Sequence, residues 1–95
     1  YPKEIEIILN NIQGIKESAI IGVKHSDLGE VPIAILVVDS KKTELSDNEI
    51  VEVLDGKLAK FKIPKSFIWI DKLPVNTMGK VQKKNLRIKY DKILL

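Results

Sequence analysis

A lysine at the end of a short loop is the residue whose type and setting most favour chemistry. Lys80 lies in the segment 73–81 (LPVNTMGKV), which Pro74 and Gly79 punctuate as a turn. A lysine ammonium is a compact charge with three donors on a flexible stem, so it suits charge that develops on a carboxylate or phosphoryl oxygen. Spacing alone favours the simpler interpretation, a turn glycine followed by a solvated surface lysine.

The Gly79–Lys80 pair does not complete a phosphate-binding P-loop. That motif needs a glycine where Pro74 stands and a serine or threonine where Val81 stands. It also needs a preceding strand and a helix that opens at the lysine. We therefore exclude the P-loop interpretation.

A second candidate is the segment 61–65 (FKIPK), which places one aromatic ring and two cations in a tight turn. Phe61, Lys62 and Lys65 could hold a nucleotide between them. The alternative is the end of a helix, where cations complement the negative end of the helix dipole.

Other polar residues carry weaker signals. His25 is the only histidine and has no partner for a catalytic dyad, so we expect a loop histidine near the surface. Asp27 and Glu30 have a spacing that metal ligands use, but two carboxylates in one loop are usually solvated, and we predict no metal site. The absence of cysteine excludes disulfides, Cys-ligated metals and thiol nucleophiles.

Charge is divided unevenly along the chain. Residues 1–56 carry five basic and eleven acidic side chains (net −6), and residues 57–95 carry eleven basic and two acidic ones (net +9), for a total of +3. The basic half could form a field for phosphates or merely solvate a surface, and we expect Lys83 and Lys84 to lie on a solvated helix surface.

A small nucleic-acid-binding module is one alternative interpretation of this basic half. Against it, the few aromatic residues are not interleaved with basic ones, and we expect Phe67 and Trp69 to pack in or beside the core.

Length and composition are those of one small globular domain, with 95 residues, 44% of them apolar and 31% charged. Such a chain buries about two-thirds of its unfolded surface, which leaves little room for an enclosed active site. The longest apolar run, residues 31–38, is too short to span a membrane, and no signal peptide opens the chain. With the absence of cysteine, these features lead us to expect a cytoplasmic protein.

Periodicity predicts the elements that position these residues. Pro2 begins a helix with one apolar face, and Gly14 ends it. Residues 17–24 predict a strand with alternating faces. Residues 32–39 predict a second strand that is apolar on both faces and therefore central in the sheet.

The second half predicts one more strand and two helices. Ser46 and Glu49 form a capping box that begins a helix, whose buried stripe extends to Leu58. Pro64 requires that helix to end before it. After a polar connection at residues 40–45 and this helix, residues 65–70 predict a strand, and a last helix begins at residue 82 or 83. The order indicates an α+β domain, a small mixed or antiparallel sheet with about three helices packed around it.

Several segments, taken in order, resemble the acyl-adenylate-forming enzymes, the AMP-binding enzyme family that includes the acyl-CoA synthetases. Residues 1–6 (YPKEIE) are similar to the stretch that follows the family's hinge. Residues 18–23 and 29–38 are similar to the next family blocks, and residues 58–65 (LAKFKIPK) to a later one. Residues 73–81 resemble the last signature motif. Together these segments cover nearly the whole chain in the family's order.

The resemblance implies that residues 1–95 are the C-terminal lid domain of an AMP-forming acyl-CoA ligase, without the large N-terminal domain and the hinge. In this family ATP and a carboxylic acid give an acyl-adenylate and pyrophosphate, and the thiol of CoA then displaces AMP. The lid rotates between the two steps and presents a different face in each. The resemblance thus implies ATP, CoA and Mg²⁺ as cofactors, with Mg²⁺ held by the N-terminal domain. It implies that domain and a carboxylic acid as partners, and neither nucleic acid nor a membrane span.

The resemblance also assigns roles to particular residues. Lys80 matches the adenylation lysine, a cation between the substrate carboxylate and the α-phosphate of ATP, and Gly79 precedes it in the motif. Gly29 and Glu30 match a loop that faces the active site beside the CoA tunnel in the second step. Three residues match the region that contacts the CoA nucleotide in related ligases: Phe61, Lys62 and Lys65.

The branch of the family is indicated by residues 76–84 (NTMGKVQKK) and 18–25 (SAIIGVKH), which are most similar to malonyl-CoA synthetases. Adenylation domains of peptide synthetases, a lower-ranked alternative together with other ligases, usually have an aspartate where Gln82 stands. A protein-interaction domain in which Lys80 is a bystander is a further alternative. We expect the isolated chain to bind ATP or CoA poorly and to be inactive, because most of each site belongs to the large domain.

Overall fold

A three-stranded mixed sheet forms the centre of the molecule in a computed structural model, which describes residues 1–39 and 45–95. The strands are β1 (Ile15–His25), β2 (Gly29–Val38) and β3 (Phe67–Trp69). β2 lies between the others and pairs antiparallel with β1 and parallel with β3. The predicted α+β class and the central place of the second strand are confirmed.

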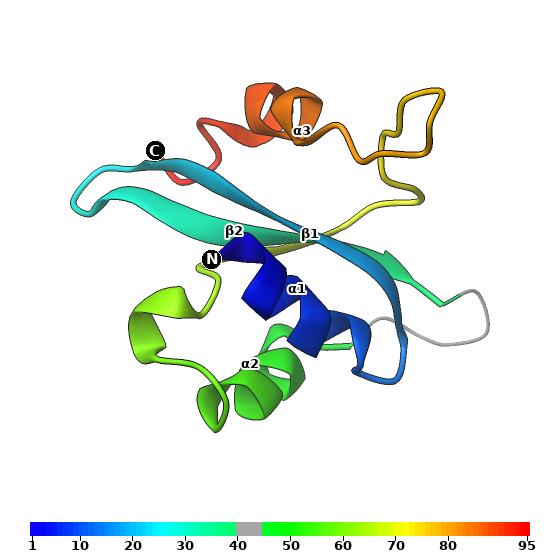
Figure 1. Cartoon of the computed structure of the whole chain (residues 1–95). Coiled ribbons are helices and arrows are strands. Elements are labelled where there is room, and N and C mark those ends of the chain that lie inside the picture. Colours follow the sequence, from blue (N-terminus) through cyan, green and yellow to red (C-terminus); the bar gives the residue numbers. More distant parts are fainter. Residues whose placement is uncertain (40–44) are drawn as a thin grey trace.

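Helices cover both faces of this sheet (Figure 1). α1 (Pro2–Asn10) and α2 (Asp47–Asp55) lie on one face, and α3 (Lys83–Tyr90) lies on the other. A short 3₁₀ helix, η1 (Lys60–Lys62), follows α2. No helix in the described part of the chain is long and apolar enough to cross a membrane.

The core has two halves because successive side chains of a strand point to opposite faces. The first half, the α1–α2 core, contains these buried residues: Ile5, Leu9, Ile15, Ile20, Ala34, Leu36, Ile50, Leu54 and Leu58. The second half, the α3 core, contains these: Ala19, Ile21, Val23, Val31, Ile33, Ile35, Val37, Leu73 and Leu86. Phe67 and Trp69 pack against the α1–α2 core, as predicted.

Three elements are shorter than the sequence patterns predict. α1 ends at Asn10, and Gly14, with a φ of 103°, lies directly before β1 rather than at the end of the helix. α2 ends at Asp55 with Gly56 as its C-cap, so its end before Pro64 is confirmed, but the prediction that Leu58 belongs to this helix is wrong. Glycine has a low helix propensity, which favours a helix end at this position. The third strand covers residues 67–69 rather than 65–70, and the predicted connection at 40–45 lies, except for Leu45, outside the described residues.

Candidate functional site

Lys80 lies in a small hairpin between β3 and α3. An antiparallel bridge between Val75 and Val81 closes it, and the N–H of Gln82 donates to the C=O of Pro74 at 2.8 Å. One residue nearer the tip, the N–H of Asn76 donates to the C=O of Lys80 at 3.0 Å. The predicted loop is thus a hydrogen-bonded turn, which we call the Lys80 hairpin (residues 74–82).

The side chain of Asn76 organises the tip of the Lys80 hairpin. Its Oδ1 accepts hydrogen bonds from the N–H groups of Met78 and Lys80, each at 2.9 Å. Gly79 takes a φ of 82°, a conformation that residues with a Cβ rarely adopt. The Nε2 of Gln82 donates to the C=O of Lys80 at 3.0 Å. The backbone of Lys80 is therefore fixed on both sides, although the sequence analysis did not single out Asn76, a residue type typical of such turns.

The side chain of Lys80 is exposed and forms no ion pair with the residues that the structure describes. Two apolar neighbours are also exposed, Val75 at 56% and Met78 at 89%. Exposed apolar side chains around an unpaired cation are typical of a surface that contacts another molecule.

The base of the Lys80 hairpin is anchored in the fold. Leu73 and Leu86, which flank it in the sequence, are both buried in the α3 core. Lys83, the first residue of α3, lies 2.6 Å from the carboxylate of Glu6 on α1. Lys83 is therefore paired and partly buried, and the prediction that it belongs to a solvated helix surface is wrong.

A second site is a cleft of about 260 Å³ between α1, the β1–β2 pair and η1, which we call the η1 cleft. Its lining includes Tyr1, Gly22, Glu30, Phe61 and Lys62. The structure thus brings together Glu30, Phe61 and Lys62, which the sequence analysis selected from two distant segments.

The walls of the η1 cleft differ in charge. The carboxylate of Glu30 lies across Gly22, where a Cβ would come within 2.5 Å of its Oε1. On the other wall Phe61 is 75% exposed. The Nζ of Lys62 lies 6.0 Å from the Phe61 ring centroid and 3.1 Å from the carboxylate of Glu4. A planar base could stack on Phe61, and a phosphate could replace Glu4 as the partner of Lys62.

Gly29 and Lys65 do not line the η1 cleft. Gly29 and Glu30 are the first two residues of β2 rather than loop residues, and Gly29 has a φ of 81°. His25 is the last residue of β1 rather than a loop residue, and its Nδ1 accepts hydrogen bonds from two N–H groups of the turn, each at 3.1 Å. Lys65 is exposed between η1 and β3. These residues therefore shape or flank the cleft without forming its walls.

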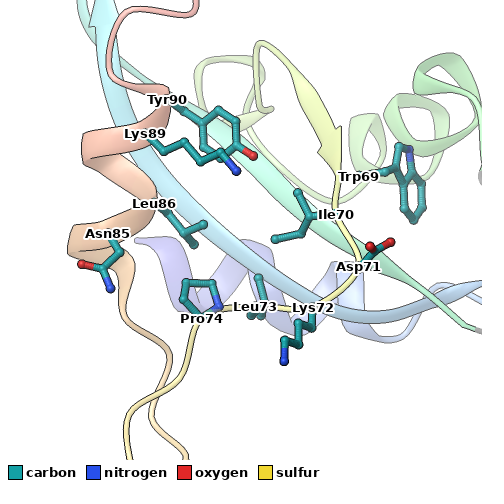
Figure 2. A pocket seen from close by; sticks show the side chains of 10 residues that line it. All are labelled: Trp69, Ile70, Asp71, Lys72, Leu73, Pro74, Asn85, Leu86, Lys89 and Tyr90. Atoms are coloured by element: carbon teal, nitrogen blue, oxygen red, sulfur yellow. The ribbon is translucent and has the colours of Figure 1, made fainter.

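A third hollow, of about 610 Å³, lies between residues 69–74 and α3. Figure 2 shows Leu86 and Tyr90 of α3 on one side of it, and Ile70 and Leu73 on the other. None of the residues predicted to be functional lines this hollow. Among residues 1–39 and 45–95 no group of three His, Cys, Asp or Glu side chains could hold a metal ion.

The Lys80 hairpin and the η1 cleft are far apart (Figure 1). The hairpin, in yellow and orange, projects beside the N-terminus of α3. η1, which contributes Phe61 and Lys62 to the cleft, lies towards the opposite end of the sheet. A ligand at one site therefore leaves the other site free.

Comparisons with known proteins show which family this chain resembles in sequence and fold. The family model of the AMP-binding enzyme C-terminal domain matches residues 4–80 of this chain. MatB from Rhodopseudomonas palustris superposes with a TM-score of 0.94, both without ligand (49% identity) and with ATP bound (48%), over 100% of this chain and 19% of MatB. The long-chain-fatty-acid–CoA ligase of Mycobacterium tuberculosis is 39% identical over 90 residues, 95% of this chain and 18% of that protein. The 2-succinylbenzoate–CoA ligase of Bacillus pumilus is 39% identical over 89 residues, 94% of this chain and 18% of that protein.

The chain belongs to the AMP-binding enzyme C-terminal domain family, which confirms the family predicted from its motifs. It spans about a fifth of the length of the relatives it matches. The two curated relatives are acid–CoA ligases by name.

Proposed function

We propose that this chain is the mobile C-terminal lid of an ATP-dependent, AMP-forming acyl-CoA ligase. The observation that carries the proposal is the exposed ammonium of Lys80 on a hydrogen-bonded turn with apolar flanks. A larger N-terminal domain of the same polypeptide supplies most of the active site, which accords with the fifth of each relative that this chain spans.

In the first step a carboxylate oxygen attacks the α-phosphorus of ATP, and pyrophosphate leaves. Both reactants are anionic, so their approach requires a cation between them. Lys80 bridges the substrate carboxylate and the α-phosphate oxygens and stabilises the charge of the transition state. It acts as a protonated ammonium, and no proton transfer is required. The ATP-bound structure of MatB supports ATP as the nucleotide.

In the second step the thiol of CoA attacks the carbonyl carbon of the acyl-adenylate, and AMP leaves. The η1 cleft presents Phe61 and Lys62 to the nucleotide part of CoA, and Gly29 and Glu30 at the start of β2 lie beside the path of the thiol. Lys65 adds positive charge next to the cleft. We assign the Mg²⁺ that accompanies ATP to the N-terminal domain.

We further propose malonate as the acid. The resemblance of residues 76–84 and 18–25 to malonyl-CoA synthetases supports that choice. The chain is 49% identical to MatB over its full length. The test is ATP–pyrophosphate exchange by the full-length enzyme with malonate, a long-chain fatty acid and 2-succinylbenzoate. A preference for another acid would refute the proposal.

We propose the reducing cytoplasm, which supplies ATP and CoA, as the compartment of this protein. The absence of cysteine from the chain supports this choice.

The experiment that tests the role of Lys80 separates the two half-reactions in the full-length enzyme. Lys80→Ala is expected to slow pyrophosphate release by about 100-fold or more, the size of effect that loss of one transition-state donor produces. Thioester formation from supplied acyl-adenylate should stay within about twofold, because this step does not use the bridging cation. Lys84→Ala removes an exposed lysine of α3 and should change neither rate. Equal losses in both half-reactions for Lys80→Ala would refute the assignment.

A further inference from the structure

Glu6 joins three elements at the outer edge of the sheet. Its Oε2 accepts a hydrogen bond from the N–H of Ile20 on β1 at 2.7 Å. The same oxygen lies 2.6 Å from the Nζ of Lys83, the first residue of α3. One carboxylate of α1 therefore connects the helices on the two faces of the sheet around its β1 edge.

The Glu6–Lys83 pair is partly withdrawn from water. The Glu6 side chain is 18% exposed and that of Lys83 is 29% exposed. An ion pair in this setting is screened less than one at the surface, and it holds its geometry better. Nearby, Ser18 of β1 donates its hydroxyl to Oδ1 of Asn10 at 2.7 Å, a second bond between β1 and α1. The carboxylate of Glu6 is therefore presented from a fixed helix.

Lys83 lies directly after the Lys80 hairpin. The last residue of the hairpin, Gln82, donates from its backbone to Pro74 and from its side chain to the C=O of Lys80. Met78 at the tip is 89% exposed, and the hydrogen bonds of the tip are to residues of the hairpin itself. The direction in which the hairpin presents Lys80 thus depends on how its base is held.

We propose that Glu6 and Lys83 are positioning residues for adenylation, and that their ion pair fixes the direction of the Lys80 hairpin. This inference rests on the proposed role of Lys80. Neither residue touches substrate. They act through the start of α3, and loss of the pair lets the hairpin swing while the fold persists. A displacement of about 1 Å at a reacting group can cost up to about 100-fold in rate, so a loosened hairpin is measurable.

The test uses Glu6→Gln and Lys83→Met in the full-length ligase. Glu6→Gln keeps an oxygen for the Ile20 N–H, and Lys83→Met keeps the apolar stem. Each is expected to lower kcat for pyrophosphate release by about tenfold, with KM for ATP and the thioester-forming rate within about twofold. The double variant should be no slower than either single one, because both remove the same pair. Lys83→Arg should recover most of the rate.

A matched control is Lys24→Met, which removes the exposed Lys24–Asp91 pair (3.3 Å) beyond the other end of α3. It should change neither half-reaction. Unchanged adenylation in Glu6→Gln and Lys83→Met would overturn the positioning role, as would equal losses in both half-reactions. If one variant fails to fold, the other carries the test.

Lys80→Ala, measured alongside, distinguishes this inference from the proposed function. If Lys80→Ala retains adenylation, the proposed function itself fails. If Lys80→Ala loses adenylation and the ion-pair variants do not, only the positioning role fails.

Discussion

At the scale of single residues, the candidate chemistry depends on a lysine whose backbone is held and whose side chain is free. The backbone of Lys80 forms hydrogen bonds with Asn76 and Gln82, and Gly79 supplies the left-handed conformation of the turn. The held backbone fixes the point from which the ammonium is presented, and the unpaired ammonium is available to the anionic oxygens that electrostatic catalysis stabilises.

Asn76 provides a direct test of this residue-scale argument. Asn76→Ala removes the acceptor for the Met78 and Lys80 N–H groups, and we expect adenylation to slow by about tenfold through loss of orientation. Asn76→Ser keeps a weaker turn-forming hydroxyl and should lose less. Single-turnover pyrophosphate release measures both, and Tm should change by less than about 2 °C because the turn is exposed. Wild-type rates in Asn76→Ala would contradict the argument.

The sequence located Lys80 because proline and glycine punctuate its loop, but it did not reveal the residues that hold it. Asn76 acts through bonds to the backbone, and turn composition alone does not say which side chain makes them. Glu6 and Lys83 lie near opposite ends of the chain, and only the tertiary fold brings them together. The roles assigned to Glu30, Phe61 and Lys62 stay predictions, although these three side chains meet in one cleft.

At the scale of elements, hydrophobic periodicity predicted β2 well and the end of α2 poorly. A strand that is apolar on both faces is buried only when it lies at the centre of a sheet with both faces covered. Leu58 follows Leu54 at helical spacing and stays buried after the helix has ended, so the apolar pattern continues past Gly56. The parallel pairing of β3 with β2 depends on a crossover that the local sequence does not specify.

The start of α2 gives an element-scale prediction on pH. Ser46 Oγ accepts from the N–H of Glu49 at 3.2 Å, and Glu49 Oε1 accepts from the N–H of Ser46 at 2.9 Å. The backbone hydrogen bond from Ser46 lowers the pKa of Glu49 below its ordinary value of 4.5. Since folding favours the charged form, this stabilisation is present above pH 4.5 and is lost as the pH falls through the lowered pKa.

We therefore expect Glu49→Gln to reduce the free energy of unfolding at pH 7, and we expect its difference from the wild type to shrink at about pH 3. Urea unfolding of the chain at the two pH values measures this. Glu52→Gln removes a charge from the same helix outside the capping box and is the control. A difference that does not change with pH would argue against the capping contribution.

At the scale of the whole molecule, two candidate sites lie on different faces of one sheet. The Lys80 hairpin belongs to the α3 side, whereas the η1 cleft is formed with α1. A lid that uses both sites in one reaction must turn between the two steps, which is the movement that the family resemblance implies. Residues 57–95, with a net charge of +9, contain both Lys62 and Lys80, the cations that would meet phosphate oxygens at the two sites.

The most direct test of this two-faced account is a crossed comparison of both half-reactions in full-length Lys80→Ala and Phe61→Ala enzymes. Lys80→Ala should slow adenylation alone. Phe61→Ala should raise KM for CoA by about tenfold or more, in line with the loss of one base–aromatic stack, and leave adenylation unchanged. The account would be contradicted if both variants slowed the same half-reaction, or if each slowed both half-reactions equally.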